Sequence, residues 1–134
     1  MGQSEDRLRR LLEDELEECC EADVEHRMGE LEQVADRADR VVHTDTAVLG
    51  VLSNETRLLL VRALDTAGRE LCVCELEALA DVSESAVSHA LSDLANVGLV
   101  TREKRGKWRY YNATERATAI LSTLDETRPR GENA

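Results

Sequence analysis

Several kinds of residue are scarce or missing in this chain of 134 residues. It contains no Phe, one Trp, two Tyr and one Pro, so its core must be built from aliphatic side chains. The longest aliphatic run, Leu58 to Val61, is far too short to cross a bilayer, and Met1 to Arg10 is too polar for a signal peptide. The sequence therefore predicts a small cytoplasmic protein without a membrane partner and argues against a large enzyme with a deep substrate cleft.

Lysine is also scarce, with Lys104 and Lys107 only, and acidic residues outnumber basic ones by 28 to 17, a net charge of −11. Residues 1–40 contain 14 acidic and 6 basic side chains, whereas residues 98–112 contain five basic ones and one acidic one. An acidic chain ordinarily repels nucleic acid, but the basic residues of this chain are concentrated in one segment. That segment is therefore a candidate phosphate-binding surface. The acidic, lysine-poor composition also predicts a protein of a halophilic cytoplasm, where the salt concentration is molar. The alternative is an acidic protein from a cell with an ordinary salt concentration.

Helices are predicted throughout the acidic N-terminal part. Apolar residues recur at helical spacing over residues 2–18 and again over residues 24–42, and a further short helix is predicted over residues 46–52. The second of these helices carries little bulk at Ala35 and Ala38, so it needs a partner surface. Cys19 and Cys20 lie between the first two predicted helices, and His26 follows them.

The segment "CELEALADVSESAVSHALSDLANVG", residues 74–98, has the pattern of a helix-turn-helix. It predicts a short helix to Ala80, a tight turn, and a second helix from Glu84 to Val97 with Ser83 as its N-cap. One arc of the second helix is apolar, and the opposite arc carries short hydrogen-bonding side chains. Such an arc can approach the major groove closely and reach base edges. Its candidate DNA-binding residues are Ser85, Ser88, His89 and Ser92.

A basic hairpin is predicted directly after the helix-turn-helix. Two extended runs flank the turn Arg105-Gly106, with Trp108 and Tyr110 expected on the face that packs against the helices. The cationic tip can lie along phosphates, and its candidate contacts are Arg102, Lys104, Arg105, Lys107 and Arg109. An amphipathic helix or a basic hairpin alone proves little, but together they predict a DNA-binding winged helix, mainly α with a small β-hairpin wing.

The predicted organisation has three parts. Residues 1–44 form an acidic helical extension with a cysteine pair, residues 45–113 form the winged helix-turn-helix domain, and residues 114–134 form a C-terminal helix and tail. In the last part, the stripe of Ala117, Ile120, Leu121 and Leu124 predicts a dimerisation surface.

Cysteines Cys72 and Cys74, in "ELCVCEL", are separated by one residue. In the reducing cytoplasm, such cysteines favour metal binding or redox chemistry over a structural disulfide, and core packing is the remaining alternative. Side chains at i and i+2 diverge in mid-helix, so a shared metal ion requires the pair at the start of a helix. A helix N-terminus also favours the thiolate that soft metals bind, although two thiolates do not complete a site.

The segments "ELCVCEL", "LSNETRLLLVRAL", "VSESAVSHALSDLANVGLV" and "REKRGKWRYYN" together resemble the ArsR/SmtB family of metal-responsive repressors over residues 48–114. The resemblance implies a homodimeric winged helix that binds operator DNA when metal-free and releases it when metal binds, controlling metal resistance or efflux genes. It also implies that the four residues Ser85, Ser88, His89 and Ser92 belong to the recognition helix.

The resemblance further implies that Cys72 and Cys74 belong to the family's metal site at the first helix of the helix-turn-helix. The arsenic-sensing branch often has a third cysteine three residues later, where this chain has Glu77. The cadmium- and lead-sensing CadC branch instead adds cysteines from the N-terminal extension of the other subunit. That layout is closer to this chain, and it implies a composite site with Cys19 and Cys20.

Several alternatives stay open for this site. Two adjacent cysteines need not both reach one ion, so one of Cys19 and Cys20 can be idle. The alternatives are that both extend the apolar stripe of the first helix, or that His26 is a substitute ligand. The effector that the resemblance implies is Cd, Pb or Zn, or As(III) or Sb(III) held by three of the four thiolates. A thiol-redox regulator with no metal response would use the same cysteines. An enzyme is not predicted, because the chain has no Cys-x-x-Cys and no legible set of residues around a nucleophile.

Overall fold

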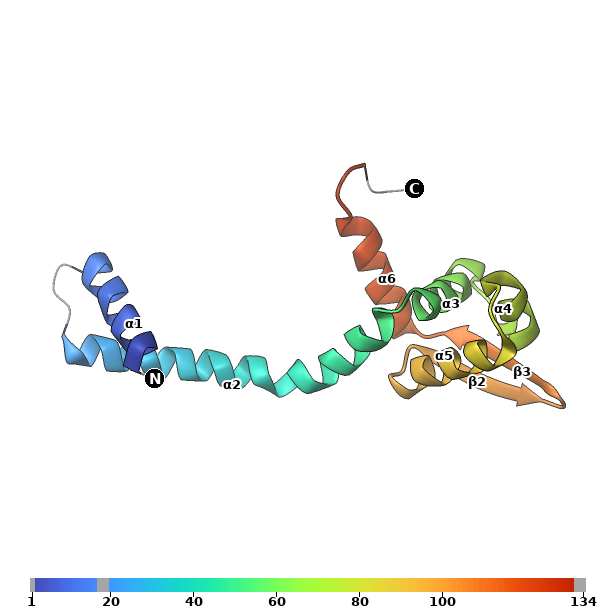
Figure 1. Ribbon diagram of the computed structural model, residues 1–134, viewed down its shortest axis with the longest axis horizontal. Coiled ribbons are helices and arrows are strands. Elements are labelled where there is room, and N and C mark those ends of the chain that lie inside the picture. Colours follow the sequence, from blue (N-terminus) through green and yellow to red (C-terminus); the bar gives the residue numbers. More distant parts are fainter. Residues whose placement is uncertain (1, 17–19, 132–134) are drawn as a thin grey trace. The chain divides into compact units, whose positions relative to one another are not determined.

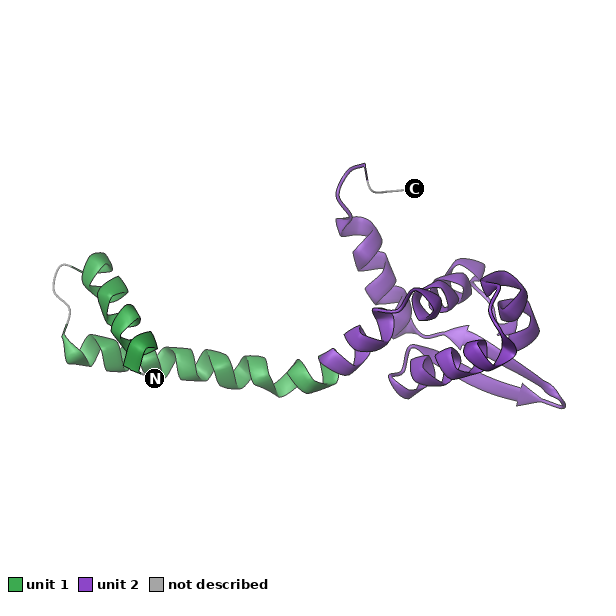
Figure 2. Cartoon of the chain, in the orientation of Figure 1, with its two compact units in different colours: residues 1–45 green, residues 46–134 purple. Residues whose placement is uncertain are grey.

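The computed structural model describes residues 2–16 and 20–131 (Figure 1). These residues form, in chain order, α1 (Gly2–Glu15), α2 (Glu21–Leu52), α3 (Glu55–Ala67), β1 (Leu71–Cys72), α4 (Val73–Ala80), α5 (Glu84–Asn96), β2 (Val100–Arg105), β3 (Trp108–Ala113) and α6 (Glu115–Thr127). The chain divides into two compact units, residues 1–45 and residues 46–134 (Figure 2). Across the described residues, no helix has the length and apolar character needed to cross a membrane.

The first unit is a pair of helices held by a small apolar contact. Leu12 of α1 and Val24 of α2 are each 1% exposed. The contact is flanked by an ion pair between Arg9 and Glu21, whose nearest nitrogen and oxygen atoms are 2.6 Å apart. Further along α2 in this unit, Val34, Val41 and Val42 remain exposed, so this helix presents an apolar surface that α1 does not cover.

Helix α2 is longer than the sequence pattern indicated. The two helices predicted over residues 24–42 and 46–52 are one continuous helix, Glu21–Leu52. The prediction of a break was wrong because the joining residues His43, Thr44 and Asp45 include no Gly or Pro, and polar residues alone do not end a helix.

The second unit contains the main hydrophobic core, and its helices begin and end at recognisable caps. Asn54 caps α3 by accepting a hydrogen bond from the Arg57 N–H, and Gly68 ends that helix in the left-handed conformation, with φ +64°. The core is aliphatic, as the lack of Phe requires. Its fully buried residues include Leu60, Val61, Leu64, Leu76, Val87, Leu91, Leu94, Leu99 and Leu121.

The wing is a three-stranded antiparallel sheet in the order β1-β3-β2. The hairpin loop is Gly106-Lys107, since Arg105 pairs with Trp108, and not Arg105-Gly106 as the sequence suggested. Gly106 has φ +62°, which fits the first central position of a type II′ turn, the kind that matches the twist of a hairpin. Strand β1 was not predicted, because two residues are too short to show an alternating pattern.

The sheet packs its faces differently from the prediction. Tyr111 is the buried ring, 3% exposed, and it lies opposite Leu71 in the β1–β3 ladder. Trp108 is 48% exposed and Tyr110 is half-buried. Because side chains alternate along a strand, Trp108 and Tyr110 occupy the face opposite Tyr111, so the expectation that they form the packing face was wrong.

Candidate nucleic-acid interface and thiol pair

Helices α4 and α5 form the helix-turn-helix. Asp81 ends α4 in a left-handed conformation with φ 53°, and its N–H bonds to the Glu77 carbonyl. Ser83 caps α5, accepting a hydrogen bond from the Ala86 N–H at 3.1 Å. Val87 and Leu91 are completely buried. The turn chemistry and the apolar arc therefore fix which side of α5 faces outward.

The polar arc of α5 lies on that outward side. Ser85, His89 and Ser92 are exposed and Ser88 is half-buried. Asp93, an acid on the same helix, forms an ion pair with Arg57 of α3, with the nearest atoms 3.5 Å apart. This pairing offsets a negative charge that would otherwise repel phosphate.

Four of the five basic residues predicted for the wing line one hollow together with Gly106: Arg102, Lys104, Lys107 and Arg109. The register explains the grouping, because Lys104 pairs with Arg109 and Arg102 pairs with Tyr111, so these side chains share one face of the sheet. The hairpin extends beyond the helices of this unit (Figure 1). The hollow is a concentrated cationic surface in an otherwise acidic chain.

Arg105, the fifth of these residues, is placed differently. It forms an ion pair with Glu70, and its guanidinium carbon lies 3.9 Å from the centroid of the Tyr110 ring. The hydrogen bond to Glu70 raises the pKa of Arg105, so the guanidinium stays charged. Arg105 is therefore already engaged within the protein on the other face of the wing.

Cys72 and Cys74 meet at the start of α4. Cys72 is the last residue of β1 and the N-cap of α4, with extended backbone angles, and Cys74 lies in the first turn. The Cys74 thiol donates to the Cys72 sulfur, with the two sulfurs 3.2 Å apart. Cys72 is 6% exposed, whereas Cys74 is exposed to solvent. The change from strand to helix between the two residues allows their side chains to converge.

The surroundings of the pair hold the backbone and tune the thiols. The Glu75 carboxylate accepts a hydrogen bond from the Cys72 N–H at 2.9 Å, the backbone half of a capping box. That bond, with the ion pair to Arg69, keeps the pKa of Glu75 below its ordinary value. The hydrogen bond to Cys72 raises the pKa of the Cys74 thiol. A thiophilic ion that binds here must therefore displace thiol protons.

A cavity of about 180 Å³ opens beside the two sulfurs. It brings the pair together with acidic residues of the helix-turn-helix and with the wing. Glu77, which stands where the arsenic-sensing pattern has a third cysteine, lines it, as does Trp108, the one tryptophan of the chain. The full lining is Cys72, Val73, Cys74, Glu77, Glu84, Lys107, Trp108 and Arg109.

The N-terminal cysteines are only partly described. Cys19 lies outside the described residues. Cys20 immediately precedes α2, with its N–H 3.0 Å and its sulfur 3.4 Å from the Asp23 carboxylate. His26 pairs with Glu30, at 2.8 Å between nitrogen and oxygen. Among residues 2–16 and 20–131, no three His, Cys, Asp or Glu side chains are grouped as ligands for one ion. Cys72 and Cys74 therefore need further ligands to complete a site.

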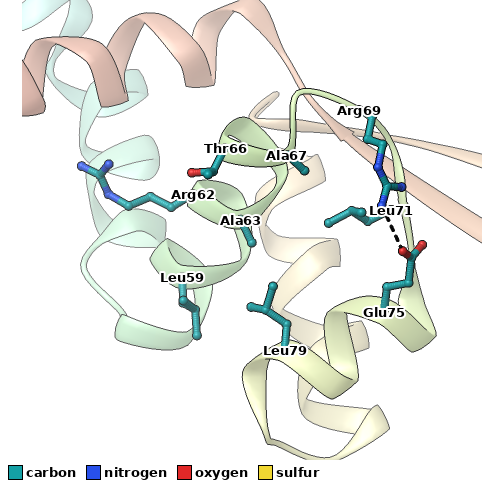
Figure 3. Close-up of a pocket in the computed structure, with 9 residues that line it drawn as sticks. All are labelled: Leu59, Arg62, Ala63, Thr66, Ala67, Arg69, Leu71, Glu75 and Leu79. Carbon is teal, nitrogen blue, oxygen red and sulfur yellow. Dashed lines mark hydrogen bonds and ion pairs between the residues drawn. The ribbon is translucent and has the colours of Figure 1, made fainter.

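A second, apolar groove of about 700 Å³ lies between α3 and α4 (Figure 3). Leu59 and Leu79 face one another across it, and both are more than 40% exposed. Arg69 and Glu75, 3.4 Å apart, border it on the side nearest β1. The groove thus adjoins the carboxylate that caps Cys72.

The sequence interpretation missed three residues around the thiol pair: Glu70, Glu75 and Tyr110. Glu75 could have been found, since an acid three residues after a helix N-cap is the signature of a capping box. Glu70 and Tyr110 could not, because their link to Cys72 depends on strand β1 and its register with β3.

Comparison with known proteins agrees with this architecture. The family described as "Bacterial regulatory protein, arsR family" matches residues 54–102. A protein of Halobacterium salinarum named "Putative arsenical resistance operon repressor ArsR" is 48% identical over 126 residues, 93% of this chain and 98% of the relative. The cadmium resistance regulatory protein CadC of Listeria innocua is 43% identical over 61 residues, 46% of this chain and 50% of that protein. The crystal structure of NolR from Sinorhizobium fredii superposes with a TM-score of 0.62 at 26% identity, covering 69% of this chain and 91% of NolR.

The fold and its two surfaces define a winged helix-turn-helix transcriptional regulator. The similarity over nearly the whole chain is more specific than the fold. The chain belongs to the arsR family and is an ArsR-family transcriptional repressor. The predicted fold class and the predicted family are thereby confirmed. So is the prediction that the protein is not an enzyme, because this family and its structural neighbours are DNA-binding transcriptional regulators.

Proposed function

We propose that this protein is a cytoplasmic, homodimeric repressor that releases operator DNA when a thiophilic ion binds Cys72 and Cys74. One observation carries the proposal. The two sulfurs are 3.2 Å apart, and one of them belongs to strand β1, which pairs with β3 of the wing hairpin. A soft ion is the ligand that two adjacent thiols favour, and its capture would act on a DNA-binding element directly.

The DNA-binding surface in this proposal has two parts. The polar arc of α5 (Ser85, Ser88, His89 and Ser92) reads base edges in the major groove. The cationic hollow of the wing (Arg102, Lys104, Lys107 and Arg109) holds the phosphate backbone. The sequence assigned Arg105 to the same contacts, but its engagement with Glu70 favours a different role.

Dimerisation is part of the proposal because half-sites on DNA are read by symmetric pairs. Helix α2 exposes apolar side chains, among them Val34, Val41 and Val42. Their exposure supports a dimer in which another subunit covers this helix. The predicted dimerisation stripe on α6 is only partly available to another subunit. Ala117 and Leu121 are buried in the core of this chain and Ile120 is partly buried against it, whereas Leu124 is exposed.

The effector is proposed from the sulfur geometry and the ligand supply. Tetrahedral Zn(II), with Zn–S bonds of about 2.3 Å, requires sulfurs about 3.8 Å apart, so the pair must open slightly to accept it. As(III) or Sb(III) needs only three thiolates, which Cys72, Cys74 and one of Cys19 and Cys20 from the other subunit can supply. The name of the Halobacterium relative favours arsenite, and that of CadC keeps cadmium, lead and zinc as candidates. Genes of metal resistance or efflux are the proposed targets.

Fluorescence anisotropy of labelled DNA from upstream of the protein's own gene tests this proposal. Reduced protein in molar KCl is titrated with and without arsenite, cadmium, lead or zinc, and the series is repeated with Cys72→Ser. Serine keeps an N-cap oxygen at this position, so the helix start is preserved while the thiolate is lost. We expect release in the parent protein and none in the variant. DNA binding that ignores every ion would refute a metal-sensing role.

A thiol-redox regulator is the second candidate, and the same sulfur distance favours it. Two thiols 3.2 Å apart can close to a disulfide bond of about 2.05 Å, with two electrons and two protons passing to an oxidant such as hydrogen peroxide. In that case mild oxidation would consume the Cys72 and Cys74 thiols and release DNA, while metal ions added to reduced protein would not.

A further inference from the structure

Arg105 differs from its neighbours in the face of the wing that it occupies. The register pairs Lys104 with Arg109, and Arg105 with Trp108. Because side chains alternate along a strand, Arg105 lies on the sheet face opposite the cationic hollow that Lys104 and Arg109 line. A residue whose purpose was to hold phosphate would be expected in that hollow.

The two contacts of Arg105 lie on either side of Cys72. Its ion-pair partner, Glu70, precedes Cys72 by two residues along the chain. The ring beneath its guanidinium belongs to Tyr110, which is the residue that pairs with Cys72 across the sheet. Arg105 is thus connected to Cys72 by two routes, one through the chain and one through the β1–β3 ladder.

These contacts position the wing more than they stabilise the fold. The side chains of Arg105 and Glu70 are 49% and 38% exposed, and ion pairs this exposed contribute little to stability. Their location is nevertheless specific, since they tie the end of β2 to the segment before β1. Strand β1 itself is only two residues long, and the ion pair adds a second connection to the hairpin beside the β1–β3 ladder and the buried side chain of Leu71.

We propose that Glu70, Arg105 and Tyr110 are positioning residues. They transmit the movement caused by ion binding at Cys72 and Cys74 to the cationic hollow of the wing. This inference rests on the proposed release of DNA by a thiophilic ion. Ion binding draws the two sulfurs into the geometry of the ion, and residues 70–72 move with them. Through the ladder and the ion pair, the wing then shifts relative to α5, so base contacts and phosphate contacts no longer fit the same DNA.

The release ratio measures this coupling: it is the Kd for operator DNA with arsenite, or separately with cadmium, divided by the Kd without the ion. Glu70→Gln removes the ion pair and leaves every proposed DNA contact and ion ligand in place. We expect its ion-free Kd to stay within about twofold of the parent value and its release ratio to fall by about threefold or more. Its affinity for arsenite, followed by Trp108 emission, should not change.

An exchanged pair and a control variant separate coupling from general damage. Glu70→Arg combined with Arg105→Glu rebuilds the ion pair in reverse but loses the contact of Arg105 with the Tyr110 ring, so it should restore the release ratio in part. Lys104→Gln removes the neighbouring cation on the opposite face of the sheet. It should weaken DNA binding with and without the ion and leave the release ratio unchanged.

Each result has a defined meaning. A parental release ratio in Glu70→Gln would overturn the positioning role and leave ion-driven release intact. An exchanged pair that stays as uncoupled as Glu70→Gln would overturn the role proposed for the ion pair between Glu70 and Arg105. A parent protein with a release ratio of one would remove the proposed function and, with it, this inference.

Discussion

Cys20 and Cys72 occupy equivalent local positions in two different parts of the molecule. Each directly precedes a helix, and each backbone N–H donates to a carboxylate three residues later, Asp23 at 3.0 Å and Glu75 at 2.9 Å. Beyond that, the two helix starts differ. Cys72 is nearly buried, belongs to a strand, and has a second sulfur 3.2 Å away. Cys20 is exposed, next to a helix pair with a small apolar contact.

The difference suggests a division of labour between the two cysteine segments. The start of α4 holds two sulfurs in a fixed geometry, so it can define which ions fit. The start of α2 offers an exposed thiol on a segment with little core around it, so it can adapt to an ion that the first pair already holds. We therefore propose Cys72 and Cys74 as the primary ligands and the N-terminal cysteines as the ligands that complete the site.

The largest expected effect comes from removing one sulfur at a time, from the start of α4 in one variant and from the start of α2 in another. Cys72→Ser should abolish release of DNA by arsenite, because one thiol cannot hold the ion while the others assemble. Cys20→Ser should leave a measurable but weaker response, since Cys19 can replace it as the third thiolate. Anisotropy titrations of both variants measure the difference. An equal loss in the two variants would contradict the division of labour.

Lowering the salt concentration should unfold the N-terminal unit before the second unit. Residues 1–40 contain 14 acidic and 6 basic side chains, and their repulsion grows as the Debye length rises from about 3 Å in molar salt to about 10 Å at 0.1 M. We expect the N-terminal helix pair to lose helicity first on dialysis from molar KCl, while Trp108 emission still reports an intact wing. Circular dichroism and fluorescence on one sample test this. Full stability of both signals in low salt would argue against a halophilic protein.

Ion binding should also change the emission of Trp108, an effect of moderate size. Its side chain lines the same cavity as Cys72 and Cys74, and the chain has no other tryptophan. Arsenite or cadmium should therefore alter the emission saturably in the parent and in Cys20→Ser at higher concentrations, but not in Cys72→Ser. A response that survives Cys72→Ser would place the binding event elsewhere.

The smallest expected effect concerns the two capping carboxylates. Glu75→Ala removes the acceptor for the Cys72 N–H beside the main core and should lower the melting temperature by a few degrees. Asp23→Ala removes the matching acceptor at the exposed start of α2 and should change it less. Thermal unfolding followed by circular dichroism in molar KCl measures both. A larger effect at Asp23 would reverse the ranking of the two helix starts.

The sequence was most informative where local chemistry repeats a known pattern. Ser83 as a cap and the apolar arc of α5 were both readable, because each depends on residues within one or two turns. The single helix α2 and the Gly106-Lys107 loop were misjudged by a few residues, where weak turn signals compete.

What could not be read depends on contacts between distant segments. The pairing of Cys72 with Tyr110 and of Glu70 with Arg105 joins residues 38 and 35 positions apart, and neither leaves a periodic signal. The same is true of the buried face of the wing. Alternation showed that Tyr111 and Tyr110 point opposite ways, but only the packing of β3 decides which of them is buried.

The central claim is that ion binding and DNA binding oppose one another, and reciprocity tests it most directly. Arsenite would be titrated into reduced protein in molar KCl, with Trp108 emission as the signal, in the absence and in the presence of saturating operator DNA. The account predicts that operator weakens arsenite binding by the same factor by which arsenite weakens operator binding. Equal arsenite affinity with and without operator would contradict it.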